Sequence, residues 1–559
     1  MPDDATVDPR IDPQTGHETL DPQSEEETLD PRDWDELRAF AHRAVDDAVD
    51  YMASLRERPA WEHAPAHVKA HFAGPAPAGP QPLDEIYAEY LEYVRPYQLG
   101  NSHPRFWGWV LGSGTPTSAV AALLAASTDA VCGIYSFVAN NYVELQVLDW
   151  CKELLGYPLE AGGLLTSGCS ASNLIALAVA RNAKAGFDVR GEGLAGALVG
   201  TGGAPAAPAA PGPLDGAGPV APARLTVYCS VEAHSSLTKA VELLGMGTSS
   251  LRRVPTDAAM RVDLGALAAM VAADRAAGLR PVCVVGVAGT TNTGSIDDLP
   301  GLADFCAAED LWFHVDGAFG AWAAIAPESR HLVAGMERAD SLAYDLHKWM
   351  NLTYPVGCVL VRDAQAQLDT FSLTPSYLAH GEGDRGLTAV DVPWLSDFGY
   401  ELSRGFHALK VWMALKEHGT EKFARVIQQN IDQARYLEGL VAAAPELELA
   451  LPPALNIVCF RYVGRGPGGS APGDRGPDGA SGSADPDDTA PDDAALDQLN
   501  KEIELELQER GIAVPSVSTI DGRKYLHVAV ANHRSRSADF DLLVREVVRL
   551  GGELAARLD

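Results

Sequence analysis

The chain has 559 residues, of which 47% are hydrophobic, and carries a formal net charge of -33 at pH 7. This length allows two or three domains with a large core, and the composition is typical of globular proteins. Phosphate backbones and anionic lipids would be repelled over a long range, so we expect neither nucleic acid nor a membrane as a partner. No apolar run reaches membrane-spanning length, and the first residues lack the basic and apolar regions of an export signal, which predicts a cytoplasmic protein.

The eight cysteines lie in apolar surroundings and never form a C-x-x-C pair. That pattern predicts reduced core thiols and argues against disulfides or a metal centre. Arginine outnumbers lysine, and acidic residues occur throughout the chain. A dense carboxylate surface would suit a salt-rich cytoplasm, whereas a GC-rich genome together with acidic tails would give much the same composition. The sequence leaves both explanations open.

The N-terminal region divides into an acidic tail and a helical segment. Residues 1–32 are rich in Pro, Thr and Gln, so we expect them to be disordered. Asp33 then offers a helix cap, with Glu36 three residues later, and apolar residues recur at helical spacing until Pro59. Residues 33–100 are therefore predicted to form a helical segment that packs on its own chain or on a second subunit.

Residues 101–395 are predicted to form a large α/β domain. A helix is expected over 144–155, stopped by Gly156. Beyond it, short β-rich runs alternate with helix-like segments, which predicts a mainly parallel sheet covered by helices. The predicted strands are 225–229, 281–288, 311–315, 341–344 and 357–361, and the predicted helices are 170–185, 236–244, 264–277 and 299–308.

Residues 396–559 are predicted to form a smaller α+β domain. It would contain long helices at 400–418 and 420–441, strands at 456–462 and 525–530, a helix at 496–510 and a closing helix. Two stretches dominated by Gly, Pro, Ala and Asp interrupt the chain at about 191–223 and 464–493. Neither can bury enough apolar surface to order itself, so both are predicted to be flexible insertions.

One lysine stands apart in the stretch ADSLAYDLHKWMNLTYPVGCVLVR, residues 339–362. Lys348 is the single lysine between Lys239 and Lys410. Apolar runs on both sides indicate short buried strands, with Lys348 on the turn between them. Burial tends to lower the pKa of a lysine and leaves its amine able to attack a carbonyl. A lysine that snorkels from a strand end to water is the alternative, and this stretch alone favours neither.

The loop TSGCSASN, residues 166–173, opens a predicted helix. Gly168 permits a tight turn that would point the amides of Cys169 and Ser170 outward at the helix N-terminus. Such amides suit a phosphate, although many loops of Gly and Ser only cap helices.

Three further loops follow predicted strands, at the edge where ligands collect in such sheets. His234 in EAHSS could face a planar ring or act as a capping group. Thr290 and Thr291 offer hydroxyls directly after a strand. Asp316 ends an apolar strand, where a buried carboxylate needs a cation or a protonated nitrogen opposite.

A phosphate loop, a histidine, a buried aspartate and an isolated lysine together suit one ligand, pyridoxal 5'-phosphate, whose phosphate, pyridinium and aldehyde need these groups. The chain resembles the group II pyridoxal-phosphate-dependent amino-acid decarboxylases of fold type I, a family that includes aromatic-L-amino-acid decarboxylase and glutamate decarboxylase. The matching stretches are HPRFWGWV, TSGCSASN, HSS, AGTTNTG, HVDGAFG, DLHKW, LSRGFHALKVW and VANHR.

The resemblance implies a seven-stranded-type central sheet and a homodimer whose N-terminal helices wrap across the partner. It also implies decarboxylation of an L-amino acid through a Schiff base and a quinonoid. Lys348 would form the Schiff base, and Asp316 would pair with the pyridine nitrogen. His234 would stack on one ring face and Ala318 would lie against the other.

The resemblance assigns the remaining cofactor contacts as well. Gly168, Cys169 and Ser170 match the phosphate cradle of the family. His347 would sit beside the lysine near the phosphate, and Thr291 would lie close to the cofactor and the substrate carboxylate.

The chain departs from the family at two places. Many members carry a tyrosine on a mobile loop, to which the return of a proton to Cα is assigned, whereas the nearest counterparts here are Trp394 and Leu395. Either Tyr377 or another group substitutes, or the reaction ends differently, for example in an aldehyde. Asp345 stands where several relatives have asparagine near the phosphate. A carboxylate there would be unfavourable unless it points away or is hydrogen-bonded.

The substrate side chain is poorly determined by the sequence. Candidate substrate contacts are His103, Phe106 and Trp107, with Arg404 as a carboxylate partner. The aromatic stretch around His103 is, however, typical of an ordinary core as well. Aromatic amino acids are favoured by Phe106, Trp107, Phe137, Trp322 and Trp394, but glutamate, 2,4-diaminobutyrate and cysteine sulfinate remain open. An aldehyde-forming or carbon–carbon lyase and a non-catalytic binding homologue are the alternatives to a decarboxylase.

Overall fold

The computed structural model describes residues 28–134, 138–194, 224–373, 394–464 and 493–558. Most of the predicted acidic tail and of the two predicted insertions therefore lies outside the described residues, as do Phe137 and Tyr377. Within the described ranges, none of the helices combines the length and the apolar character that crossing a membrane requires. All eight cysteines fall inside these ranges, and each is a buried free thiol.

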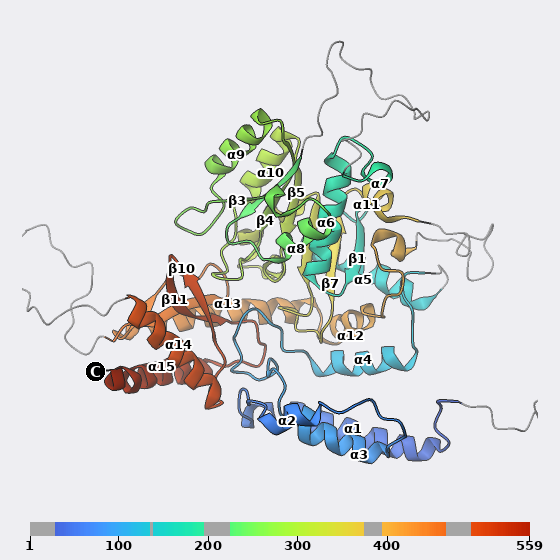
Figure 1. Cartoon of the computed structure of the whole chain (residues 1–559), viewed down its shortest axis with the longest axis vertical. Coiled ribbons are helices and arrows are strands. Elements are labelled where there is room, and N and C mark those ends of the chain that lie inside the picture. Colours follow the sequence, from blue (N-terminus) through green and yellow to red (C-terminus); the bar gives the residue numbers. More distant parts are fainter. Residues whose placement is uncertain (1–27, 135–137, 195–223, 374–393, 465–492, 559) are drawn as a thin grey trace, which may run out of the picture.

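A seven-stranded sheet forms the centre of the larger body, in the order β1-β7-β6-β5-β4-β2-β3 (Figure 1). Neighbouring strands from β3 to β6 are parallel, and β7 runs antiparallel to both β6 and β1. The predicted mainly parallel seven-stranded sheet is confirmed. The strands are β1 Gly162–Thr166, β2 Leu225–Ser230, β3 Leu251–Val254, β4 Arg280–Val287, β5 Trp312–Asp316, β6 Ser341–Asp345 and β7 Gly357–Val361.

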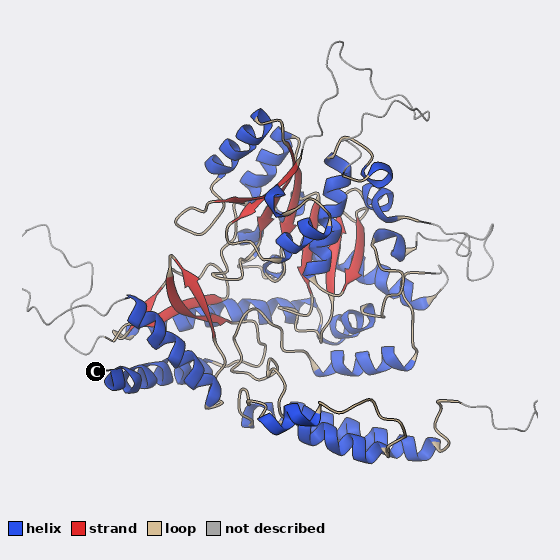
Figure 2. Cartoon of the chain, viewed as in Figure 1, coloured by secondary structure: helices blue, strands red, loops and turns tan. Residues whose placement is uncertain are grey.

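Helices cover this sheet, as Figure 2 shows. Five strands are buried along their whole length, as expected for a sheet with both faces covered. The helices of this body are α4 Pro116–Ser127, α5 Ala139–Leu155, α6 Cys169–Lys184, α7 Val189–Glu192, α8 Ser236–Leu243, α9 Leu264–Ala276, α10 Leu299–Glu309, α11 Ala364–Phe371 and α12 Ala408–His418. Helix α5 ends where predicted, at Gly156 with φ of 67°.

A smaller four-stranded antiparallel sheet, in the order β10-β11-β9-β8, lies beside the larger body. Its elements are α13 Thr420–Ala443, β8 Leu447–Leu449, β9 Ile457–Tyr462, α14 Asp493–Glu509, β10 Ser516–Ile520, β11 Arg523–Ala529 and α15 Ser537–Leu558. Residues of α12 and of the first half of α13 belong to the large core, whereas Ala434, Leu437 and Val441 belong to a second core. The long helix α13 therefore joins the two bodies.

The N-terminal helices lie together along one edge of the molecule (Figure 1). They are α1 Trp34–Ala53, α2 Ala66–His71 and α3 Leu83–Glu89, which continues as a π-helical turn over Tyr90–Val94. Asp33 caps α1 as predicted, because its side chain accepts from the backbone N–H groups of Asp35 and Glu36. No residue of α1 or α3 is buried in this single chain.

Candidate active site

A cavity of about 300 Å³ opens at one edge of the large sheet. Strands β1, β2, β4, β5 and β6 run in the same direction, so their carboxyl ends meet at this edge, where ligands bind in such sheets. The residues around the cavity come from segments far apart in the sequence. They are Ser167, Gly168, Cys169, Ser170, Ala171, Asn173, His234, Ser236, Asp316, Ala318, Asp345, His347, Lys348 and Tyr354.

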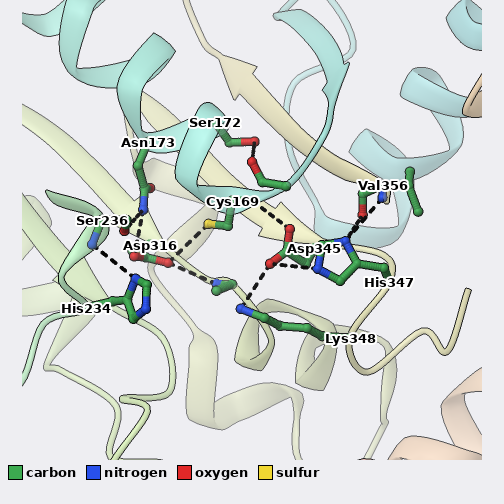
Figure 3. A network of polar contacts seen from close by, with 12 residues as sticks. Cys169, Ser172, Asn173, His234, Ser236, Asp316, Asp345, His347, Lys348 and Val356 are labelled. Atoms are coloured by element: carbon green, nitrogen blue, oxygen red, sulfur yellow. Dashed lines mark hydrogen bonds and ion pairs between the residues drawn. The ribbon is translucent and has the colours of Figure 1, made fainter. Parts of the chain in front are cut away.

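Lys348 extends from the turn after β6 into this cavity (Figure 3). Its Nζ lies 3.0 Å from Oδ2 of Asp345. Burial alone would lower the pKa of Lys348, but the carboxylates of Asp345 and Asp316 outweigh burial and hold that pKa above its usual value. The sequence-based expectation of a lowered lysine pKa is therefore wrong for the cofactor-free chain, because Asp345 supplies a counter-charge three residues away.

Asp316 lies at the end of β5, and its carboxylate accepts three hydrogen bonds. Its carboxylate accepts from Asn173 Nδ2 at 2.9 Å, from the backbone N–H of Ala318 at 3.1 Å and from Cys169 Sγ at 3.4 Å. These donors fix the orientation of the buried carboxylate at the wall of the cavity. Asp316 can therefore keep a protonated ring nitrogen opposite it.

A buried chain of polar groups orients Asp316 from behind. Asn173 Oδ1 lies 2.9 Å from His314 Nε2, and His314 Nδ1 lies 2.9 Å from Ser341 Oγ, which accepts from Trp312 Nε1 at 2.8 Å. Burial lowers the pKa of His314 to about 4, although Asp316 opposes that shift. Nε2 of this ring lies against the amide oxygen of Asn173, and the amide nitrogen is directed toward Asp316. Sequence reasoning missed Asn173 and His314, although both lie inside the quoted motifs.

The N-terminus of α6 forms the opposite wall. Gly168 has φ of 155°, and a Cβ atom on the facing Gly357 would lie only 2.6 Å from Gly168 Cα. Glycine at both positions lets the loop before α6 pack directly against β7. The backbone N–H of Cys169 donates to Oδ1 of Asp345 at 2.6 Å.

Two histidines complete the cavity. Ser236 N–H donates to His234 Nδ1 at 3.2 Å, which leaves the proton of a neutral ring on Nε2, and the ring stays exposed. Nδ1 of His347 lies 2.8 Å from the carbonyl oxygen of Val356, and the centroid of the His347 ring is 4.1 Å from that of the Tyr354 ring. Tyr354, from the same turn, is a lining residue that sequence reasoning did not single out.

Four predicted contacts do not line the cavity. Thr291 lies on the loop after β4, where its carbonyl oxygen is 2.8 Å from His527 Nε2. His103 is buried, and Phe106 packs with Ala60 and Val514. Trp107 stacks on Phe540 in the second core and donates from Nε1 to Ser535 at 3.0 Å. The ordinary-core explanation of this aromatic stretch accounts for Phe106 and Trp107 in the single chain.

Arg404, the predicted carboxylate partner, does not reach the cavity either. Its buried guanidinium forms an ion pair with Glu144 of α5 and donates to the carbonyl oxygen of Leu165 at 2.6 Å. Glu144 Oε1 also accepts from the backbone N–H of Leu165 at 3.1 Å. This geometry gives no support to substrate binding by Arg404, because the charge is already neutralised where it ties α5 to β1.

The pair Arg404–Glu144 is expected to contribute to stability instead. Removing one partner leaves a buried charge without compensation, so E144Q should lower the free energy of unfolding by about 3–5 kcal/mol. Urea denaturation followed by circular dichroism measures the loss. The double variant E144Q/R404Q should lose less than the two single variants together, and strict additivity would contradict a direct pairing.

The residues present fit pyridoxal 5'-phosphate. The cavity combines the amine of Lys348, the hydrogen-bonded carboxylate of Asp316 and the exposed imidazole of His234. It also includes the N-terminus of α6, where two glycines are in close contact. Lys348 would meet the aldehyde of the cofactor, Asp316 its ring nitrogen and the start of α6 its phosphate. The start of α6 follows β1, Asp316 ends β5 and Lys348 follows β6. The carboxyl ends of these three strands lie at the same edge of the sheet.

Comparisons with known proteins agree with this cofactor. Residues 217–463 match the pyridoxal-dependent decarboxylase conserved domain. The chain is 29% identical to an aromatic-L-amino-acid decarboxylase of Bacillus atrophaeus, with 93% of this chain and 96% of the relative covered. It is 28% identical to a phenylacetaldehyde synthase of Arabidopsis thaliana, with 77% and 83% covered.

A solved structure extends the likeness to the whole fold. The crystal structure of Oryza sativa TDC with PLP and tryptamine matches with a TM-score of 0.79 and 26% sequence identity, covering 94% of this chain and 100% of that one. Residues 217–463 thus match a pyridoxal-dependent decarboxylase domain, and the chain as a whole is similar in sequence and fold to the fold-type I group II amino-acid decarboxylases.

Proposed function

We propose that this protein releases the α-carboxylate of an L-amino acid as carbon dioxide and forms the amine, with aromatic amino acids favoured. The observation that carries this proposal is the single cavity in which Lys348 and Asp316 face the N-terminus of α6. When bound, pyridoxal 5'-phosphate supplies the electron sink that accepts the electron pair of the broken bond.

The side chains of the cavity have separate tasks in this proposal. Lys348 would supply the amine that holds the cofactor at its aldehyde. Asp316, oriented by its hydrogen-bond donors, would face the ring nitrogen and favour a proton on it, which makes the ring a better electron acceptor. His234 and Ala318 would confine the planar ring between them, which fixes the position of the ring in the cavity.

The preference for aromatic substrates is supported by the relatives. They include an aromatic-L-amino-acid decarboxylase of Bacillus atrophaeus and a tryptophan decarboxylase of Oryza sativa. The aromatic residues chosen from the sequence do not add support, since Phe106, Trp107, Trp322 and Trp394 are all buried and none lines the cavity.

An aldehyde-forming reaction is the second candidate. Trp394 and Leu395 stand where many family members have a proton-returning tyrosine, and neither side chain can act as an acid at Cα. Both are buried. The similarity to a phenylacetaldehyde synthase of Arabidopsis thaliana fits this outcome as well.

One assay separates the two reactions. The purified protein, loaded with pyridoxal 5'-phosphate, is given L-tryptophan, L-tyrosine, L-phenylalanine, L-glutamate, L-2,4-diaminobutyrate and L-cysteine sulfinate in turn. Carbon dioxide, amine, aldehyde and peroxide are measured together. Amine and carbon dioxide in equal amounts, highest with an aromatic substrate, would support the proposal. Aldehyde with peroxide would overturn simple decarboxylation, and no product from any substrate would favour a non-catalytic homologue.

We also infer a homodimer built on the N-terminal helices, in the cytoplasm. Helices α1, α3 and α4 expose apolar side chains that a second copy would cover: Trp34, Val45, Val49, Leu83, Ile86, Val120, Leu123 and Leu124. The buried free thiols suit a reducing compartment. Sedimentation equilibrium should give twice the chain mass, and a monomer at micromolar concentration would contradict the dimer.

A further inference from the structure

Asp345 places a carboxylate against the N-terminus of α6. The residue ends β6 and is buried. Its Oδ1 accepts the backbone N–H of Cys169 at 2.6 Å, and its Oδ2 lies 3.0 Å from Lys348 Nζ and 3.6 Å from His347 Nε2. The carboxylate is therefore hydrogen-bonded and points into the cavity, which Figure 3 shows.

The first turn of a helix is a place for one anion. Its unpaired N–H groups and the positive end of the helix dipole favour a negative charge there. Gly168, Cys169 and Ser170 line the cavity at this end of α6, which is the part that suits the cofactor phosphate. The carboxylate of Asp345 already accepts the first of these N–H groups, that of Cys169.

We propose that Asp345 competes with the phosphate of pyridoxal 5'-phosphate for the N-terminus of α6, so that the chain takes up a proton as it binds the cofactor. The consequence is a cofactor affinity that falls as the pH rises. The proposal concerns the cofactor alone and holds whichever amino acid is the substrate.

The charges around Asp345 set the sign of this effect. Lys348 is the ammonium partner of Asp345, and His347 lies on the same turn. From other elements, Cys169 of α6, Asp316 of β5, His234 after β2 and Tyr354 before β7 share the cavity. In the cofactor-free chain Lys348 balances Asp345, while Asp316 adds a second negative charge.

A phosphate brings up to two further negative charges, since its second pKa is about 6. Like charges close together raise the pKa of a carboxyl group, so the occupied site binds a proton more tightly than the empty one. Because the complex then holds more protons than the free chain, its affinity decreases with rising pH.

Asp345 could instead act through Lys348, since it raises the pKa of that amine. The two routes differ in which ligand they affect. Competition for the helix N-terminus affects only ligands that carry a phosphate, whereas an effect on the lysine affects every ligand with the aldehyde. Pyridoxal, which has the aldehyde and lacks the phosphate, distinguishes them.

The test compares the full-length cofactor-free chain with D345N. The amide oxygen of D345N can still accept the N–H of Cys169, so the variant removes the charge and keeps the hydrogen bond. D310N is the matched control, because Asp310 is exposed, lies at the amino end of β5 and has a left-handed backbone that asparagine tolerates. Dissociation constants for pyridoxal 5'-phosphate and for pyridoxal are measured by absorbance at about pH 6 and about pH 8.5, below and above full ionisation of the phosphate.

The proposal predicts that D345N binds pyridoxal 5'-phosphate on the order of ten- to a hundredfold more tightly than the wild-type chain at the higher pH, since the variant no longer places a carboxylate charge beside the phosphate charge. The gain should shrink at the lower pH and should be at least tenfold smaller for pyridoxal, which registers only the effect of Asp345 on Lys348, and D310N should behave as wild type. Calorimetry in buffers of different ionisation enthalpy should show proton uptake by the wild-type chain that D345N lacks.

Three results would overturn the proposal. They are equal or weaker binding of pyridoxal 5'-phosphate by D345N, an equal gain for pyridoxal, and proton uptake that D345N leaves unchanged. None of these would bear on decarboxylation, which the substrate assay tests separately.

Discussion

K348A is expected to release carbon dioxide on the order of a thousandfold more slowly than the wild-type protein, or slower still. The substitution removes the group that forms the covalent link to the cofactor, and with it the catalysed reaction pathway. Lys348 is the one amine among the residues that line the cavity, and Nζ reaches its interior. The measurement is initial carbon dioxide release at saturating pyridoxal 5'-phosphate.

K239A provides the matched control for this prediction. Lys239 is exposed on α8 and does not line the cavity, so its loss should leave the rate within about twofold of wild type, as is usual for surface changes. A thermal melt of K348A separates lost chemistry from lost folding, because Asp345 loses its partner in that variant. A folded K348A that keeps a tenth or more of the wild-type rate would exclude the role given to Lys348.

D316N is expected to lower the rate by on the order of a hundred- to ten-thousandfold, the range for removing a positioned proton-holding or charge-stabilising group. The amide of this variant cannot hold a proton on the facing ring nitrogen, so the ring becomes a poorer electron acceptor. The variant can still accept the N–H of Ala318. The loss should appear in kcat and be accompanied by a changed absorbance of the bound cofactor.

N173A serves as a graded comparison for D316N. It removes the 2.9 Å hydrogen bond to Asp316 but leaves the carboxylate in place. We expect a loss of about tenfold, between wild type and D316N, because the charge remains but is less well oriented. D316N with wild-type absorbance and a rate within threefold of wild type would show that this carboxylate does not serve the ring nitrogen.

The central strands were predictable because burial on both faces leaves continuous apolar runs, as in β4 and β7. Two strands of the large sheet escaped prediction for different reasons. Strand β1, GGLLT, begins with two glycines, which weaken any β pattern, and β3, LRRV, carries two arginines on an edge strand. Both gain their strand conformation from neighbours that the local sequence does not reveal.

Helix α12 begins later than predicted for a similar reason. Its apolar spacing extends back toward Tyr400, but the segment from Gly399 to His407 is not helical. There Arg404 is held by Glu144 and Leu165, which lie far away in the chain. A buried ion pair between distant residues leaves no periodic signal, so tertiary contacts override local propensity here.

The site was predictable as a set of motifs but not as an electrostatic arrangement. Lys348, Asp316, His234 and the start of α6 each follow a strand, and parallel strands bring such positions together. The counter-charge from Asp345 depends on where its side chain points, and the support of Asp316 depends on the amide orientation of Asn173. Such facts follow from packing, which the order of residues alone does not specify.

The most direct measurement is borohydride reduction of the purified protein after addition of pyridoxal 5'-phosphate, followed by peptide mapping. Borohydride makes a covalent link between a lysine and the cofactor permanent. We predict one modified peptide, with the pyridoxyl group on Lys348 and on no other lysine. A modification spread over surface lysines, or a protein that carries none at Lys348, would contradict a covalent role of this residue.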